Sequence, residues 1–166
     1  MISYADYEDY LNWCEDLGMN LKDKRILYPK DFKKAHDEVQ IQYTSLKEKI
    51  CDKGIREYAK ELEKYIFEEK ELTIKPIQTQ KELITESVKL QHCVRTYAER
   101  VAHRKTSIFA IRENSNPKEP FVTLELKNNV VIQCRAFKNK EPADNVKRFV
   151  NDWCNKFNYR SCFSNV

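Results

Sequence analysis

Glycine is unusually scarce in this chain. The 166 residues contain two glycines, whereas average usage would give about twelve. The glycine-rich loops that cradle phosphates in nucleotide hydrolases and dinucleotide oxidoreductases are absent, and so is the HExxH helix of zinc proteases. These absences exclude the three enzyme classes that carry such motifs.

Long apolar runs are also missing. No stretch of about 18 apolar residues occurs, so the sequence predicts no membrane-spanning helix. The first ten residues, MISYADYEDY, lack the basic and apolar regions of a secretory signal peptide. We therefore expect a cytoplasmic protein.

Cysteine pairs with metal-binding spacing do not occur. The six cysteines are Cys14, Cys51, Cys93, Cys134, Cys154 and Cys162. They form no CxxC pair, and no two histidines lie three to five residues apart. We expect mostly buried free thiols, with no disulfide framework, no metal site and no other cofactor.

The residues that are present suffice for a folded protein. Hydrophobic residues make up 41% of the chain and charged residues 34%, which is too apolar for a disordered protein. A chain of this length fits one domain, so we expect a single domain over 1–166. Within it we expect a helical part over 1–70, an α+β core over 71–158 and a tail over 159–166. The formal charge of +4 is a weak sign of an anionic partner.

Helical spacing dominates the first part of the chain. Apolar residues recur every three or four positions over 4–17, with Ser3 as a candidate N-cap. A longer stripe runs over 32–50 and another over 55–66. Gly54 stands between them and is expected to break the helix, which leaves either one kinked helix or an antiparallel pair.

A further helix and a possible first strand follow. Glu71–Pro76 alternates weakly and ends at a proline, as a short edge strand does. Thr79 and Glu82 match a capping box that opens a helical region reaching about Ala102, bent near His92. Its expected apolar residues are Leu83, Ile84, Val88, Val94 and Ala98.

The rest of the chain reads as a small sheet and a last helix. Strands are predicted at Ser107–Arg112, Phe121–Lys127 and Val131–Phe137, and a helix at Ala143–Phe157. We therefore expect an α+β fold, with N-terminal helices, a small mainly antiparallel sheet of three to four strands, and a C-terminal helix.

Side-chain alternation predicts how the last two strands pair. Residues directly opposite each other in antiparallel strands share a face. A two-residue loop at Asn128–Asn129 would mix apolar and polar partners on both faces, whereas a three-residue loop through Val130 separates them. The expected apolar pairs are Leu126–Ile132, Leu124–Cys134 and Val122–Ala136. The expected polar pairs are Glu125–Gln133 and Thr123–Arg135.

The polar face of this sheet would gather groups that bind anions. Phe109 and Ile111 suit the core side of their strand, which turns Arg112 toward the polar pairs. Two guanidinium groups, a carboxylate, an amide and a hydroxyl then share one surface, and such a cluster binds phosphate or stabilises developing negative charge. An alternative stays open, in which Glu125 and Arg135 form an exposed ion pair worth about 0–1 kcal/mol.

His92 and Cys93 suggest a thiol–imidazole pair, but their adjacency argues against it. Neighbouring side chains on a helix point about 100° apart, so these two cannot easily form a hydrogen bond. We expect Cys93 to be buried. His92 suits a lone acid–base group, with Tyr97 and Arg100 about one and two turns further along a continuous helix. A hydrogen-bonded histidine at a helix bend is the open alternative.

Five runs of sequence occur in an order that is typical of one protein family. They are YPKDFKKAHD (28–37), ELITESVKLQHCVRTYAERVA (82–102), SIFAIR, PFVTLEL and IQCRAFKN. These runs resemble the C-terminal part of the PcfJ-like proteins of conjugative plasmids and phages. The family pattern falls on Leu90, His92, Cys93, Val94, Tyr97, Thr123, Leu124, Glu125, Gln133, Arg135 and Asn139.

The chain departs from this family pattern at glycine positions. Ser87, Arg95, Arg104 and Ala136 stand where the family tends to have glycine, so places that let backbone approach a ligand are filled. Either the site has diverged toward binding without catalysis, or those glycines served only turns. Arg95 and Arg104 would add positive charge beside the HCV motif, which favours an anionic partner.

Together these features lead to one main hypothesis. We expect a mobile-element protein, from a phage or plasmid, that binds nucleic acid through a polar, basic sheet face, with phosphodiester cleavage as an open activity. Two alternatives stay open: a non-enzymatic inhibitor of a host defence nuclease, of the anti-CRISPR type, and an enzyme that acts on a nucleotide signal. The partner is thus RNA, DNA or a nucleic-acid-binding protein complex. The expected catalytic residues are His92, Glu125 and Arg135, and the expected substrate-binding residues are Tyr97, Arg100, Arg112, Thr123, Gln133 and Asn139.

Overall fold

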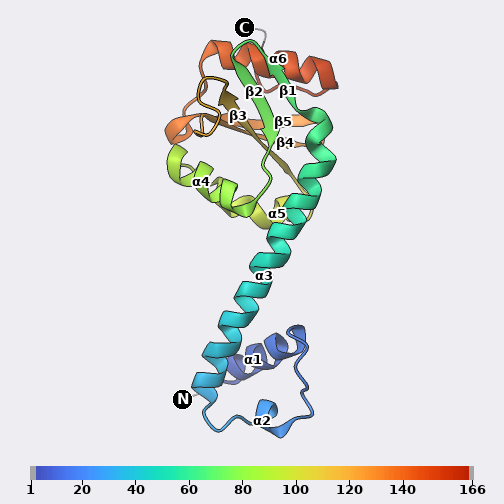
Figure 1. Cartoon of the computed structure of the whole chain (residues 1–166), viewed down its shortest axis with the longest axis vertical. Coiled ribbons are helices and arrows are strands. Elements are labelled where there is room, and N and C mark those ends of the chain that lie inside the picture. The colour runs from blue at the N-terminus through green and yellow to red at the C-terminus, as the bar shows by residue number, and fades with distance from the viewer. Residues whose placement is uncertain (1–2, 165–166) are drawn as a thin grey trace. The chain divides into compact units, whose positions relative to one another are not determined.

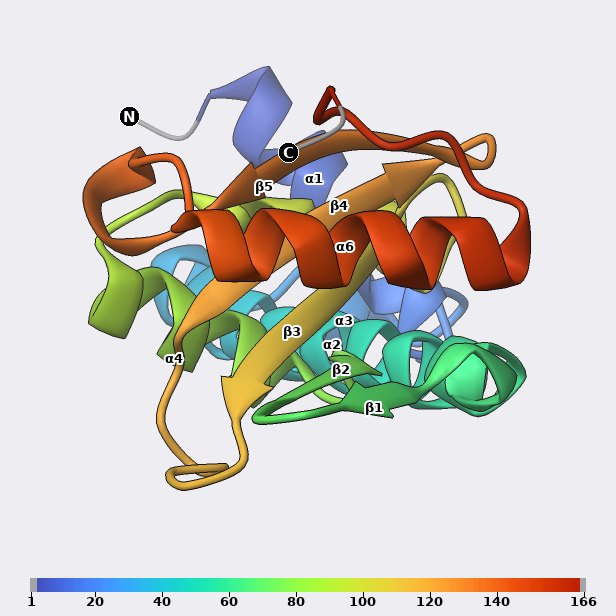
Figure 2. The ribbon, with the colours of Figure 1, turned by 90° about the horizontal axis from the view of Figure 1, so that it is seen from above.

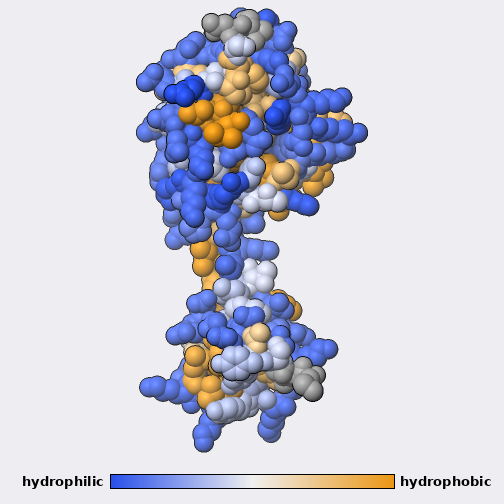
Figure 3. All heavy atoms as spheres, turned by 180° about the vertical axis from the view of Figure 1, so that it is seen from behind, coloured by the Kyte–Doolittle hydropathy of each residue, from blue (hydrophilic) through white to orange (hydrophobic). Residues whose placement is uncertain are grey.

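The computed structural model describes residues 3–164. The chain divides into two compact units, Met1–Ile50 and Cys51–Val166, and Figure 1 shows the elements of each. The single domain expected from the sequence stays a prediction. Within the described residues, no helix combines the length and the apolar character that crossing a membrane requires. Hydrophilic side chains cover most of the visible face of each unit (Figure 3).

The first unit is helical. It contains α1 (Tyr4–Asp16), α2 (Lys24–Leu27) and the first part of α3 (Phe32–Leu62). As predicted, Ser3 caps α1, because its hydroxyl accepts a hydrogen bond from the Asp6 amide at 3.1 Å. The buried side chains of this unit are Tyr10, Cys14 and Val39.

Gly54 does not break α3, so the prediction of a kink or an antiparallel pair is wrong. The helix runs through this position to Leu62. A Cβ atom at Gly54 would lie 3.0 Å from both the Cβ and the carbonyl oxygen of Ala102. Glycine therefore serves close packing here, where the helix touches the end of α5 (Ala98–Ala102).

The second unit is built on an antiparallel sheet of five strands, in the order β1-β2-β3-β4-β5. The strands are β1 (Phe67–Glu69), β2 (Leu72–Pro76), β3 (Ser107–Glu113), β4 (Val122–Lys127) and β5 (Val130–Arg135). The predicted α+β class is confirmed, with more strands than the three to four expected. β2 is not at an edge, because it pairs with both β1 and β3. The three residues of β1 are too few to show a strand pattern in the sequence.

The two faces of this sheet are covered by different helices (Figure 2). α6 (Asp144–Phe157) lies on one face, where the ring of Trp153 packs against Phe109 with centroids 5.0 Å apart. α4 (Gln80–Leu90), α5 and the last part of α3 lie on the other face, against Ile108 and Ala110. The polar residues that the sequence places on one side of the sheet belong to this second face.

The β4–β5 hairpin has the predicted register over its middle part. Thr123, Leu124 and Glu125 pair with Arg135, Cys134 and Gln133 in that order. Nearer the turn the prediction is wrong, because Asn128 and Asn129 alone form the turn, both in the left-handed region with φ of 51° and 61°. β5 therefore has one extra residue, Ile132, which forms a bulge between the pairs Glu125–Gln133 and Leu126–Val131. Ile132 is 52% exposed.

Candidate functional site

A small cavity opens on the polar side of the sheet, between β4, β5 and the segment that follows α4. Its volume is about 30 Å³, which is room for about two water molecules if each needs about 10–15 Å³. A wider groove of about 470 Å³ adjoins it, since His92, Cys93 and Asn139 line both. We refer to the two together as the cavity and its groove.

Seven of the nine side chains predicted for the site line this cavity. They are His92, Tyr97, Thr123, Glu125, Gln133, Arg135 and Asn139. The other two do not. The Arg100 guanidinium stacks on the Tyr97 ring at 3.9 Å, and Arg112 is engaged with a carboxylate that the sequence analysis missed.

The end of α4 places His92 beside the sheet. The helix stops at Leu90, and Gln91 takes a left-handed conformation with φ of 53°. The His92 amide then donates to the Ser87 carbonyl at 3.2 Å, which closes the turn. The bend expected near His92 is confirmed, because the helical region that reaches Ala102 is interrupted after Leu90. Tyr97 and Arg100 therefore do not follow His92 on one continuous helix. A short 3-10 turn over Val94–Tyr97 brings Tyr97 to the cavity instead.

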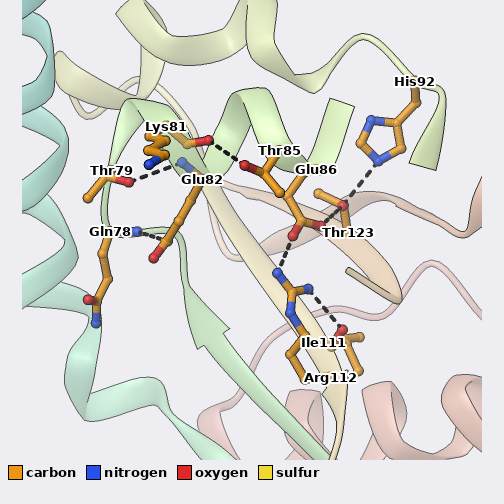
Figure 4. A network of polar contacts seen from close by, with 10 residues as sticks. All are labelled: Gln78, Thr79, Lys81, Glu82, Thr85, Glu86, His92, Ile111, Arg112 and Thr123. Carbon is orange, nitrogen blue, oxygen red and sulfur yellow. Dashed lines mark hydrogen bonds and ion pairs between the residues drawn. The ribbon is translucent and has the colours of Figure 1, made fainter. Parts of the chain in front are cut away.

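The missed carboxylate belongs to Glu86, which is fully buried. Its Oε1 forms an ion pair with Arg112, and its Oε2 accepts a hydrogen bond from the Thr123 hydroxyl at 2.8 Å (Figure 4). The buried face of α4 is Leu83, Glu86, Ser87 and Leu90, whereas the expected Ile84 and Val88 are exposed. The sequence did contain a signal for this burial. Glu86 lies three residues after Leu83 and four before Leu90, which is the spacing of residues on one buried face of a helix.

These contacts fix the tautomer of His92. Thr123 has one hydroxyl proton, and the Glu86 carboxylate, which can only accept, takes it. His92 Nε2 lies 3.1 Å from Thr123 Oγ1 (Figure 4). Because the Thr123 proton is already used, Nε2 must carry a proton and donate this hydrogen bond. His92 Nδ1 therefore carries a lone pair. This atom is buried and has no hydrogen-bond partner among residues 3–164.

The charge of His92 follows from the same surroundings. Burial lowers the pKa of His92 below its ordinary value, against smaller opposing effects of its own backbone and of the Glu86 charge. The imidazole is thus neutral at pH 7. A buried acceptor without a hydrogen bond lowers the free energy of unfolding by about 1–3 kcal/mol. Such groups are rare in native structures, and binding of a ligand is one reason for keeping one.

Glu125 and Arg135 do not form the exposed ion pair that the alternative predicted. Glu125 is buried, and its two oxygens accept hydrogen bonds of 2.8 Å each from the Thr106 hydroxyl and the Gln133 amide. Arg135 is half-buried and has no ion pair within residues 3–164. Its positive charge is therefore available to a ligand in the cavity.

Cys93 and Arg104 differ from expectation, whereas Arg95 agrees with it. Cys93 is exposed, so its predicted burial is wrong. Arg95 lines the groove, so it adds positive charge beside the HCV motif as expected. Arg104 instead pairs with Glu61 and has a φ of 58°, a conformation in which glycine would carry no strain.

Among the described residues, no group of three or more histidine, cysteine, aspartate or glutamate side chains could hold a metal ion. The cavity instead presents hydrogen-bond donors. The Tyr97 hydroxyl accepts from the Gln133 amide at 3.2 Å, which leaves its own proton for a ligand. Together with Arg135, this donor can hold the oxygens of an anionic group.

Comparison with known proteins finds one family and one curated relative. The family model described as PcfJ-like protein matches residues 6–150. An uncharacterized protein of Listeria innocua is 31% identical over 161 residues, which is 92% of this chain and 34% of that protein. The chain thus spans about a third of the relative's length. No solved structure matches this chain.

Proposed function

Because the chain belongs to the PcfJ-like protein family, we propose that it is a phage or plasmid protein that binds nucleic acid, with a backbone phosphate in the cavity. The observation that carries the proposal is that one cavity is lined by Arg135, a cation without an ion pair among the described residues, and by His92, whose buried Nδ1 has no hydrogen-bond partner there. A phosphodiester supplies the negative charge for Arg135. Ribose supplies a hydroxyl donor for His92.

Arg135 is suited to a backbone phosphate. A guanidinium group donates two parallel hydrogen bonds to phosphate oxygens, and these bonds are stronger where water is excluded. The half-buried position of Arg135 provides such exclusion. The adjoining groove has room for the nucleotides on either side, which the cavity itself is too small to hold.

His92 gives the site a base for RNA. The ring turns so that Nδ1, which is shielded from solvent in the free protein, faces the 2′-hydroxyl of the bound ribose. Nδ1 takes the 2′-hydroxyl proton, the 2′ oxygen bonds to phosphorus, and the bond from phosphorus to the 5′ oxygen breaks. The leaving oxygen takes a proton from solvent. The products are a 2′,3′-cyclic phosphate and a 5′-hydroxyl, and Arg135 stabilises the charge on the phosphorane.

DNA separates binding from cleavage. Deoxyribose lacks the 2′ oxygen that this reaction uses as its nucleophile, whereas its phosphate is the same. We therefore expect single-stranded DNA to bind at the cavity and to remain intact.

The test uses a labelled 12-nucleotide RNA and its DNA counterpart. Arg135→Gln should weaken binding of both about tenfold or more, the loss expected for a charge-assisted hydrogen bond of about 1.5 kcal/mol or more. His92→Gln should keep binding and abolish the cyclic-phosphate product, because glutamine can replace the Nε2–H donor but is not a base. The matched control is Arg148→Gln, an exposed arginine of α6 that lies outside the cavity, and it should bind as the wild type does.

Each part of the proposal can fail separately. If the wild type binds both oligonucleotides and never cleaves RNA, the binding role stands and the role of His92 as a base is wrong. If Arg135→Gln and Arg148→Gln bind equally, or if the wild type binds neither nucleic acid, the cavity is not a phosphate site. The inhibitor alternative would then be the one to pursue.

A further inference from the structure

A second hollow lies on the same side of the sheet, beside the first half of α4. Its volume is about 530 Å³, and it is formed with β2, β3 and the connection from β3 to β4. Its charged lining residues are Lys75, Lys81, Lys118, Arg112, Glu82 and Glu86. We refer to it as the lysine cleft.

The positive charge of the lysine cleft is in excess. Four cationic and two carboxylate side chains line it. The Glu86 charge is matched by Arg112, and the Glu82 carboxylate accepts a hydrogen bond of 2.7 Å from the backbone N–H of Gln78 (Figure 4). Three lysines therefore stand against the one remaining carboxylate charge. The three lysines are exposed and form no ion pair within residues 3–164.

The lysine cleft and the cavity are neighbours. Glu86 lines the cleft, Thr123 lines the cavity, and their oxygens are 2.8 Å apart in a hydrogen bond. A buried pair of side chains is thus the wall between the two hollows. The cleft is therefore within reach of a chain molecule that is bound in the cavity and its groove.

We propose that the lysine cleft holds the phosphates of a nucleic-acid strand that continues beyond the phosphate in the cavity. Lysine is a flexible point charge, and unpaired lysines along a groove suit a backbone that must be held without reading its bases. No aromatic side chain lines the cleft within the described residues, so bases do not stack there. The ligand class is a single-stranded polynucleotide, bound through its charge.

The inference rests on the proposed function but makes a separate prediction about length and salt. A deoxydinucleotide has one phosphate and occupies only the cavity and its groove, whereas a 12-nucleotide single strand also reaches the cleft. Each phosphate contact to a single strand contributes about 0.7 to the slope of log affinity against log salt concentration. Three lysines should therefore contribute about two units of slope for the long strand and none for the dinucleotide.

The experiment compares two triple variants with the wild type. Lys75→Gln, Lys81→Gln and Lys118→Gln are combined in the test variant. The control combines Lys60→Gln, Lys105→Gln and Lys127→Gln, which are also exposed and line neither hollow. We expect the test variant to lose at least tenfold in affinity for the 12-nucleotide DNA and about two units of slope, while its affinity for the dinucleotide is unchanged. The control should match the wild type for both ligands.

The outcomes distinguish this inference from the proposed function. If the dinucleotide binds the wild type but the test variant keeps the salt slope of the long strand, the lysine cleft is not part of the path and the cavity still is. If the test variant also loses the dinucleotide, its lysines act on the cavity and the cleft is not a separate track. If neither ligand binds the wild type, both proposals are wrong.

Discussion

His92 is held by a chain of three polar contacts that ends in a buried charge. Nε2–H donates to Thr123, Thr123 donates to Glu86, and Glu86 pairs with Arg112. In the free protein such a chain fixes the tautomer and holds the ring in one orientation, because each donor and acceptor has one partner available. The result is a neutral imidazole whose other nitrogen is buried and has no hydrogen-bond partner in the described residues. Thr123 and Glu86 are thus positioning residues for His92.

Thr123→Val tests this chain of contacts. Valine keeps the shape of threonine but leaves the Glu86 oxygen and the His92 Nε2–H without a partner. We expect the free energy of unfolding to fall by about 1–3 kcal/mol, as for an unsatisfied buried polar group. Thr123→Ser keeps the hydroxyl and should restore both stability and the ring-nitrogen NMR shifts of the wild-type tautomer. Equal shifts in the valine variant and the wild type would show that Thr123 does not set the tautomer.

The lowered pKa of His92 makes stability depend on pH in one direction. The ordinary histidine pKa is about 6.5, and burial holds the pKa of His92 in the folded protein below that value. As pH falls, His92 therefore takes up a proton in the unfolded chain before it does so in the folded protein. This contribution to stability is complete above about pH 6.5 and is lost as pH falls through that value toward the folded pKa. We expect the urea midpoint of the wild type to drop more between pH 7 and pH 5 than that of His92→Gln. His103→Gln, at an exposed position, should keep the wild-type drop; if it removes the drop instead, His92 is not the group responsible.

At the scale of single elements, alternation along the strands was enough to predict the polar face. The pairs at Thr123, Glu125 and their partners came from the sequence because one face of a strand must be apolar. The bulge at Ile132 could not be predicted, because turn geometry and register compete there and only the packed sheet decides.

Glu86 shows the other limit of prediction from sequence. A glutamate in a helix is normally exposed, so the pattern around it indicated Ile84 and Val88 as the buried face. Its burial depends on Arg112 from β3, a partner that lies 26 residues further along the chain. Local periodicity carries no information about such a partner. His92 was identified from the sequence, whereas the group that orients it was not.

The contact between α3 and α5 depends on the absence of a side chain at Gly54. Alanine there gains about 1 kcal/mol of helix propensity but places its Cβ 3.0 Å from Ala102. Overpacking of this kind costs about 1–3 kcal/mol, so we expect Gly54→Ala to lower the unfolding free energy by about 1 kcal/mol. Adding Ala102→Gly removes one of the crowded atoms and should recover part of the loss, after allowance for the cost of Ala102→Gly alone. A stabilised Gly54→Ala variant would show that α5 moves away freely.

At the scale of the whole molecule, the two units have cores of very different size. The first buries Tyr10, Cys14 and Val39, whereas the second buries two clusters around its sheet. Because stability grows with buried apolar area, the first unit should be the less stable of the two. All residues that line the cavity belong to the second unit.

The two tryptophans allow each unit to be followed separately, since Trp13 lies in the first and Trp153 in the second. Trp153→Phe leaves Trp13 as the reporter, and Trp13→Phe leaves Trp153. We expect the Trp13 fluorescence transition at a lower urea concentration than the Trp153 transition, provided that each substitution is checked by circular dichroism against the wild type. Coincident transitions would instead favour the single cooperative domain that the sequence predicts.

The most direct test of the phosphate site is NMR of the Arg135 Nε–H and His92 ring signals during titration with a deoxydinucleotide. This ligand cannot be cleaved by the proposed reaction, so binding is observed alone. We predict that both signals shift and saturate together, while the Nε–H signal of Arg148 does not move. Unchanged Arg135 and His92 signals at millimolar ligand, or equal shifts at Arg148, would contradict a phosphate site at the cavity.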